Sequence, residues 1–426
     1  MNDCRDPVLQ RIGIFPPLVW GYVGLLIFMI GDGVEAGFLS PFLVERGFSE
    51  GGAAMAFTAY GLTAAVAAWL SGALCDLWGP RKVMFAGWAI WTLFEVALLL
   101  AVVSGGRQTI VACYALRGFG YPLFAFGFLV WITAVSPRAR LGAAVGWYWF
   151  AFTGGLPMLG SLLASYTVPR IGAYSTLWLS LALVAMGGLI ARIGVREPTG
   201  RRRLAPSQDN PLNTLFNSLT IAYQEPKLVM GCLVRVINTA PEFGFLVFLP
   251  GYFTKTVGFS LSEWLRLLSL MFASNILWNL LFGLLGDWFG WRRTVALCGC
   301  VGSAASVLLL YEVPRRFGAV FPLAAVAAVC YGATLAGYVP LSALMPSLTP
   351  KHRGAAMSML NLGAGASVWV GPALVGLFLP RIGVAGMMWL FAALHLLSGV
   401  LTSFLRLPAE DPLVASPHAD LIAETP

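Results

Sequence analysis

Charged residues are scarce in this sequence. Only 11% of its 426 residues are Asp, Glu, Lys or Arg and only three are histidines, whereas 58% are hydrophobic. Soluble globular proteins carry roughly 25% charged residues, so this composition excludes a soluble enzyme and a nucleic-acid-binding module. The mean hydropathy of +0.79 indicates instead a protein that crosses a lipid bilayer many times.

Motifs for catalysis, cofactors and metals are also missing. The sequence contains no GxxxxGK[ST] phosphate-binding loop, and His352, His395 and His418 are too scattered to suggest a metal site. The seven cysteines lack metal-ligand or redox spacing, and most lie in apolar runs, so we interpret them as packing residues. We therefore expect no enzyme activity, no cofactor and no bound metal.

Long apolar runs fill most of the chain. A window of about 19 residues finds twelve of them, and each can span a hydrocarbon layer of roughly 30 Å. The first run, 18–43, is too long for a cleaved signal peptide and is expected to remain as a span. The pattern predicts an all-α integral membrane protein with twelve transmembrane helices.

The polar segments between the runs predict the topology. Lys and Arg are about twice as frequent in the loops on one side, which also holds both chain ends. The positive-inside rule therefore places both termini in the cytoplasm, for a multi-pass protein of the cell inner membrane. Residues 195–226 form a polar, Arg- and Pro-rich stretch, predicted to be a cytoplasmic linker between bundles 1–194 and 227–407. The acidic residues 408–426 are expected to be a disordered cytoplasmic tail.

A repeat supports the division into two halves. GALCDLWGPRK at 72–82 follows the second run, and GLLGDWFGWRR at 283–293 follows the eighth. The shared Gly, Asp, Gly and basic positions of the second copy each lie 211 residues after their counterparts. The repeat predicts two pseudo-symmetric six-helix bundles, a known design of transporters. The acids and cations of the motif can form ion pairs that hold the cytoplasmic face closed in one state. The predicted gating residues are Asp76, Arg81, Asp287 and Arg292.

These paired segments resemble the loop signature of the major facilitator superfamily. Further segments are similar to the polyol permease family: GDGVEAGFLSPFL at 31–43, RGFGYPLF at 117–124, SYTVPRIG at 165–172 and GFSLSEWL at 258–265. The resemblance implies a monomer in the bilayer that moves a small molecule together with protons. The polyol permease family includes proton symporters of ribitol and D-arabinitol, and also exporters of catecholate siderophores.

Charged side chains inside the runs are the main candidates for function. Each costs at least about 2.5–3.5 kcal/mol at the bilayer centre, so its presence suggests a role. Asp32 and Glu35 share one face of the first span, and either can carry the coupled proton. Arg117 in the fourth span is expected to join them, either in proton coupling or in a structural ion pair. Glu95 in the third span has no sequence neighbour that would assign it.

A second group of residues is expected to contact substrate. Arg235, Asn238 and Glu242 lie about one turn apart along the seventh span, as one cavity wall would require. Amides can bond hydroxyl groups and aromatic rings can stack on a polyol or a catechol, so further candidates are Tyr121, Trp147, Asn275, Trp278, Asn361 and Trp369.

Together these features favour uptake of a pentitol-type polyol by proton symport. The alternative is efflux of a siderophore or similar iron chelator by proton antiport, which the additional acid Glu242 favours. The direction of transport and the exact substrate remain open at this point.

Overall fold

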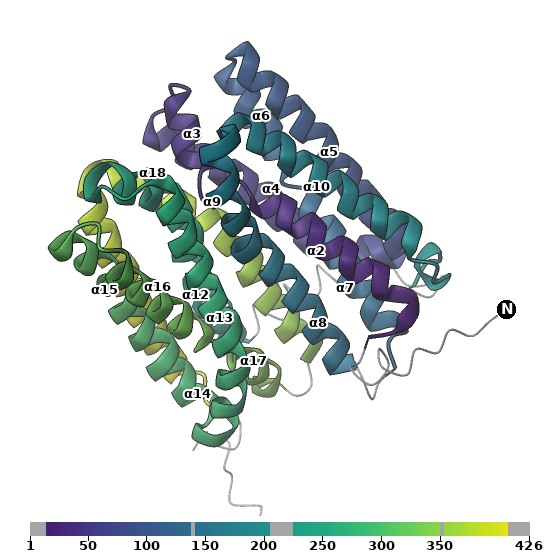
Figure 1. Cartoon of the computed structure of the whole chain (residues 1–426). Coiled ribbons are helices and arrows are strands. Elements are labelled where there is room, and N and C mark those ends of the chain that lie inside the picture. Colours follow the sequence, from purple (N-terminus) through teal and green to yellow (C-terminus); the bar gives the residue numbers. More distant parts are fainter. Residues whose placement is uncertain (1–13, 138–140, 205–224, 350–352, 408–426) are drawn as a thin grey trace, which may run out of the picture.

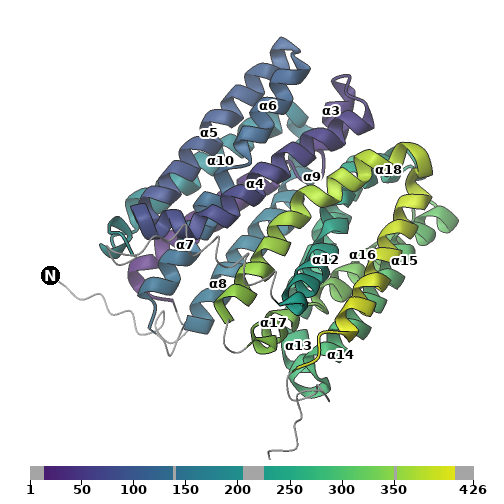
Figure 2. The same ribbon diagram turned by 180° about the vertical axis from the view of Figure 1, so that it is seen from behind.

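The computed structural model describes residues 14–137, 141–204, 225–349 and 353–407 (Figure 1). Every regular element within these ranges is a helix, which confirms the all-α prediction. The described residues contain long apolar helices arranged as two bundles, one from each half of the chain (Figures 1 and 2).

The first half begins with a short helical turn and continues through paired, antiparallel helices. Its elements are η1 (Pro16–Leu18), α2 (Val19–Gly33), α3 (Leu39–Glu45), α4 (Glu50–Trp78), α5 (Pro80–Ser104), α6 (Arg107–Arg117), α7 (Gly120–Val135), α8 (Leu141–Thr153), η3 (Gly154–Leu159), α9 (Gly160–Ile171), α10 (Ala173–Gly194) and η4 (Thr199–Arg201).

The second half repeats this plan. Its elements are α12 (Pro226–Gly251), η5 (Tyr252–Val257), α13 (Leu261–Phe289), α14 (Trp291–Thr294), η6 (Val295–Val301), α15 (Gly302–Phe317), α16 (Phe321–Ala336), α17 (Leu341–Leu348) and α18 (Arg353–Ser403).

The described helices account for twelve spans. Ten helical segments among the described residues are each long and apolar enough to cross a membrane. One of the ten, α18, contains two spans, because its backbone turns at Gly383, where φ is 64°. Residues 141–171 add a further span, which is divided into α8, η3 and α9 by the π-helical turn around Pro157.

Turn glycines reveal the internal repeat in three dimensions. Positive φ angles occur at Gly47 and Gly258 (89° and 97°), at Gly79 and Gly290 (87° and 88°), and at Gly172 and Gly383 (82° and 64°). Each pair is separated by 211 residues, as in the loop motif. A residue with a β-carbon is strained at such angles, so glycine is needed at these turns.

The turns also define two faces of the molecule. We call the end with Gly79 and Gly290 the basic face, because the Arg-rich loops lie there, and the end with Gly47 and Gly258 the opposite face.

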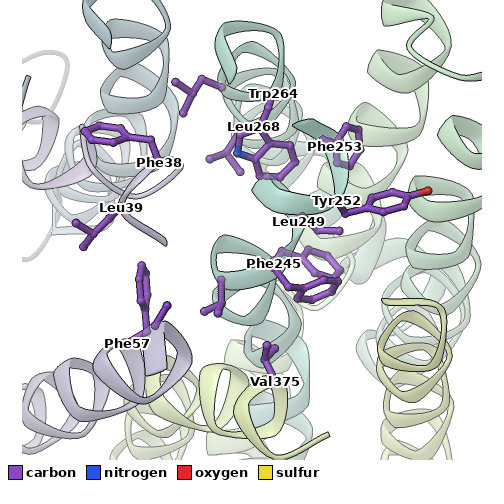
Figure 3. Close-up of a cluster of buried hydrophobic side chains, with 14 of the residues drawn as sticks. Phe38, Leu39, Phe57, Phe245, Leu249, Tyr252, Phe253, Trp264, Leu268 and Val375 are labelled. Carbon is purple, nitrogen blue, oxygen red and sulfur yellow. The ribbon is translucent and has the colours of Figure 1, made fainter. Parts of the chain in front are cut away.

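The two halves contact each other near the opposite face. Ser40 Oγ donates to the Val247 carbonyl at 2.6 Å, and the Trp264 indole donates to the Gly37 carbonyl at 3.0 Å. Around these bonds, Phe38, Leu39 and Phe57 of the first half and Phe245, Leu249, Leu268 and Val375 of the second belong to one apolar cluster (Figure 3). Hydrophobic burial therefore stabilises the contact between the halves at this end.

The same interface separates toward the basic face. On α4, a β-carbon at Gly61 would lie 2.5 Å from the Val368 carbonyl of α18, and Gly365 lies against Ala65. Farther along the same helical face of α4, Gly72 has no described atom within 4 Å of such a β-carbon. On α18, Asn361 lies one turn closer to the basic face than Gly365, and it is exposed. The described interface is thus closed at the opposite face and open toward the basic face.

The start of the predicted linker packs on the first half. Glu197 accepts hydrogen bonds from the Trp131 indole at 2.6 Å and from the backbone amides of Thr199 and Gly200 at 3.0 and 3.3 Å. The remainder of the linker, 205–224, and the tail, 408–426, lie outside the described residues.

Candidate transport site

Two transmembrane segments are interrupted where the buried charges lie. In the first span α2 ends at Gly33 and α3 begins at Leu39, and in the fourth α6 ends at Arg117 and α7 begins at Gly120. A β-carbon at residue 33 would lie 1.6 Å from the Leu156 carbonyl oxygen, so only glycine allows this close approach of η3. Helix breaks at membrane depth are tolerated where protein surrounds them, and they commonly form transporter sites.

Arg117 is the centre of a buried ion-pair cluster. Its guanidinium pairs with both oxygens of Glu35, with a distance of 2.7 Å between Nη1 and Oε2, and it also pairs with Glu95. Arg117 and Glu95 are 0% exposed and Glu35 is 3% exposed. The guanidinium carbon also lies 4.8 Å from the ring centres of Trp91 and Tyr114, within the range of cation–π attraction.

Asp32 lies beside this cluster but differs from the two glutamates. It is 4% exposed, and its Oδ1 accepts a hydrogen bond of 2.6 Å from the Trp91 indole. Among the described residues it has no cation within ion-pair distance. Asp32 is therefore an acid held by a neutral donor, whereas Glu35 and Glu95 are held by a charge.

The cluster contains more acids than cations. One guanidinium cannot neutralise three carboxylates, and an uncompensated buried charge costs several kcal/mol. The group of Asp32, Glu35, Glu95 and Arg117 becomes neutral when two of the acids are protonated. Glu95 Oε1 has no hydrogen-bond partner among the described residues, so one oxygen of this acid is free to hold a proton.

Arg235, Asn238 and Glu242 form a second polar group, on α12. The Arg235 guanidinium donates to Asn238 Oδ1 at 2.6 Å, and the Asn238 amide donates to the Leu335 carbonyl of α16 at 3.4 Å. Arg235 and Glu242 are half-buried and interact electrostatically, but no ion pair joins them. Within the described chain neither side chain has an oppositely charged partner in contact, so both remain available to a solute.

Aromatic side chains lie next to the Arg117 cluster. Tyr60 and Tyr121 stack with ring centres 6.2 Å apart, and Phe152 lies 6.4 Å from Tyr121. Phe243 of α12 and Val368 of α18 pack against the same cluster from the other half. The predicted residue Tyr121 thus lies at the interface of the halves and next to the buried charges.

The other predicted contact residues are more dispersed. Asn275 is buried and donates to the Gly332 carbonyl at 3.2 Å, and Trp278 packs on Phe282 with ring centres 5.5 Å apart. Trp147 is exposed and packs edge-on against Phe150. Asn361 and Trp369 lie on α18, the former exposed and the latter half-buried.

Of the predicted gating residues, Arg81 forms hydrogen bonds within its own half. Arg81 donates to the carbonyls of Arg192 and Val195 at 2.7 and 3.0 Å, at the end of α10 in its own half. A cation at this position satisfies helix-terminal carbonyls. Asp76 is half-buried at the end of α4. Arg292, the repeat counterpart of Arg81, lies at the start of α14. The side chain of Asp287 lies outside the described residues.

Sequence reasoning singled out Glu95 by its charge without assigning it a role, and it missed Trp91. They lie four residues apart on one face of α5, and this spacing was the sequence signal that could have linked Trp91 to Glu95. Their roles depend on the packing of α5 against α6 and α7, which brings them to Arg117.

Comparisons with known proteins agree with this architecture. The family model described as Major Facilitator Superfamily matches residues 21–260 and 231–423. The chain is 45% identical to the alpha-ketoglutarate permease of Bacillus subtilis over 407 residues, covering 95% of this chain and 92% of that protein. It is 37% identical to the D-arabinitol transporter of Klebsiella pneumoniae, covering 93% of this chain and 94% of that protein.

A solved structure shares the fold. The D-xylose–proton symporter superposes with a TM-score of 0.69 at 17% identity, covering 91% of this chain and 97% of that chain. The paired bundles, the loop repeat and these matches lead to one conclusion. The chain belongs to the Major Facilitator Superfamily, and it is a membrane transporter with relatives among the polyol permeases.

Proposed function

We propose that the protein couples protons to the transport of a small solute that carries a carboxylate group, with a 2-oxo dicarboxylate such as 2-oxoglutarate as the leading case. The observation that carries this proposal is the half-buried Arg235, a guanidinium at membrane depth whose side chain, among the described residues, is hydrogen-bonded to the neutral Asn238 alone. Guanidinium groups bind carboxylates through two parallel hydrogen bonds. The alpha-ketoglutarate permease at 45% identity supports the same solute class.

Protons would balance the charge of such a solute. Each negative charge that enters a cell against 100 mV costs about 2.3 kcal/mol, so a dianion costs roughly twice that amount. Asp32 is the proposed carrier of a coupled proton, because it is buried without a cation in contact. Glu242, near Arg235, can take up a second proton when an anion arrives.

Glu35 and Arg117 have a different proposed role. Their two-point ion pair joins the broken first span to the fourth span, so it holds the shape of the site on which Asp32 depends. Glu95 shares the same cation and can exchange a proton through its free oxygen.

A polyol is the second candidate. The D-arabinitol transporter at 37% identity supports it, and so do the amides of Asn238, Asn275 and Asn361, which can donate to and accept from hydroxyl groups. Arg235 could bind hydroxyl groups as well, but a neutral solute would not need its charge.

Transport would follow alternating access. The positive-inside rule puts the basic face in the cytoplasm, so the described state would be open to the cytoplasm and closed to the outside. Rocking of the halves about the central site would then expose Arg235 and Asp32 to each side in turn.

The test uses purified protein in proteoliposomes with an imposed pH gradient. Labelled 2-oxoglutarate, ribitol, D-arabinitol and an iron-free siderophore are followed in parallel, with and without an uncoupler. We expect uncoupler-sensitive accumulation of 2-oxoglutarate, lost in Arg235→Gln and unchanged in Arg381→Gln, a surface control. Movement of a polyol alone would favour the second candidate, and siderophore movement against the proton flow would establish the efflux alternative.

A further inference from the structure

A polar cleft lies away from the central site, where the two halves meet at the opposite face. It has a volume of about 590 Å³ and lies between α9 of the first half and the start of α13 of the second. Its lining includes Ser165, Tyr166 and Arg170 on α9, and Ser262, Glu263 and Arg266 on α13. Ser262 Oγ donates to the Ser165 carbonyl at 2.7 Å, so the cleft exists where the halves are in contact.

Two arginines in this cleft share one aromatic ring. The guanidinium carbons of Arg170 and Arg266 lie 5.7 and 5.6 Å from the ring centre of Tyr166. Both side chains are exposed, and neither forms an ion pair with a described acid. The nearest lining acid, Glu263, is already engaged by the Ser260 amide and hydroxyl, both at 2.8 Å. Two like charges therefore face one cleft without a counter-charge in contact.

The internal repeat shows that the fold does not require this arrangement. At a separation of 211 residues, Arg170 corresponds to Arg381, and both donate to the carbonyl four residues earlier, at 3.0 and 2.6 Å. Tyr166, however, corresponds to Leu377, and Arg266 corresponds to Met55. The equivalent interface between α18 and α4 thus has neither the shared ring nor the second cation. Packing of the two halves therefore does not by itself require Tyr166 and Arg266 at the α9–α13 interface.

We propose that this cleft binds an oxyanion, a carboxylate or a phosphate, between Arg170 and Arg266. Each guanidinium presents several N–H donors in a plane, which suits the oxygens of either group. Because one arginine comes from each half, the bound anion bridges the halves and favours closure of the opposite face. The ligand is either a soluble anion or the phosphate of a lipid headgroup. The inference does not depend on the proposed transport substrate.

The test uses full-length protein in micelles of a maltoside detergent, which contains no phosphate, with Arg235→Gln as the background so that the central arginine does not contribute. Inorganic phosphate and 2-oxoglutarate are titrated separately, and affinity is taken from the rise in melting temperature. We expect Arg170→Gln or Arg266→Gln to weaken binding at least about tenfold, since a charge-assisted hydrogen bond is lost. Arg381→Gln, the repeat counterpart, should leave the affinity unchanged.

A second arm separates the two sources of the anion. Nanodiscs with phosphatidylglycerol are compared by native mass spectrometry for retained lipid. If a headgroup phosphate fills the cleft, phosphatidylglycerol abolishes the response to soluble anions, and the Arg266→Gln variant retains less of this lipid. The proposal is overturned if the Arg170 and Arg266 variants match Arg381→Gln in both arms. That result would leave the transport proposal untouched, because the transport assay does not involve this cleft.

Discussion

At the scale of single residues, Asp32, Glu35 and Glu95 differ in what holds them. Glu35 and Glu95 pair with the Arg117 guanidinium, whereas the hydrogen bond that Asp32 accepts within the described chain comes from the indole of Trp91. Loss of Glu35 or Glu95 removes charge-assisted hydrogen bonds to Arg117 and leaves the other glutamate to balance its charge, whereas loss of Asp32 removes a proton site without breaking an ion pair. The three positions should therefore respond differently to neutral substitution.

For Asp32→Asn we expect loss of proton-driven accumulation with exchange of solute across the membrane retained, because the solute site and the ion pair remain. For Glu35→Gln we expect a destabilised protein, by about 1.5–3 kcal/mol, because the charge-assisted hydrogen bonds from Arg117 to the first span are weakened while Glu95 still balances the guanidinium. Accumulation, counterflow exchange and melting temperature are measured for both variants. Full accumulation by Asp32→Asn would contradict the assignment of the proton to Asp32.

Glu197 supports a pH prediction outside the membrane. Burial opposes its ionisation, but hydrogen bonds from Thr199, Trp131 and Gly200 outweigh burial and lower the pKa of Glu197. A carboxyl with a lowered folded-state pKa stabilises the fold above its ordinary pKa of about 4.3, and this contribution is lost as the pH falls through the lowered value.

Glu197→Gln should therefore lower the melting temperature at pH 7, corresponding to about 1 kcal/mol for each charge-assisted hydrogen bond weakened. The difference from the natural protein should shrink as the pH is lowered from 5 to 3, which calorimetry at a series of pH values can follow. A difference that stays constant over this range would mean that the charge of Glu197 is not what holds the linker.

At the scale of elements, the contact between α4 and α18 depends on small residues. Gly61 lies against the backbone of Val368, whereas Gly72, three turns farther on the same face, has open space around it in the described structure. Gly61→Ala should force the two helices apart and loosen the opposite face, and Gly72→Ala should have little effect. Hydrogen–deuterium exchange at 39–45 and 252–260 should rise in the first variant only. Equal exchange in both variants would show that the contact does not control closure.

Much of the helical plan could be predicted from the sequence. Apolar run length determines which segments can span a bilayer, so twelve spans followed from composition, and the Gly-Asp-Gly-basic motif revealed the repeat. The helix interruptions at 34–38 and 118–119 could not be read in this way, because they depend on close backbone approaches such as that of Gly33 to Leu156.

The site was predicted only in part, for the same reason. Asp32, Glu35 and Arg117 were found because charges are costly in apolar runs, and the structure brings them together. Glu95 could not be assigned, since its partner lies 22 residues away on another helix. The contacts of Trp91 and Tyr60 with Arg117 depend on tertiary packing between helices, which the spacing of residues along one helix does not predict.

At the scale of the whole molecule, the closed opposite face and the open basic face predict different access to water. A cysteine in place of the exposed Asn361 should react with a membrane-impermeant maleimide in inside-out vesicles and not in right-side-out vesicles. A cysteine in place of Ser367, which is 0% exposed on the same helix, should stay unlabelled in both. The unsubstituted protein, treated in the same way, measures the background labelling of its native cysteines.

Labelling of the Asn361 variant from the outside would reverse the assignment of the basic face to the cytoplasm. Labelling at Ser367 would show that the halves separate farther than the described interface does.

The contact between the halves near the opposite face also has a mechanical consequence. With Gly61 and Val368 as the point of contact, the part of α4 that runs on to Trp78 acts as a lever arm of about 25 Å, since a helix rises 1.5 Å per residue. A rotation of roughly 10° about that contact moves the far end of the helix by about 4 Å, more than the diameter of a water molecule. A small change in side-chain packing at the contact of Gly61 with Val368 therefore produces a much larger displacement of α4 at the basic face.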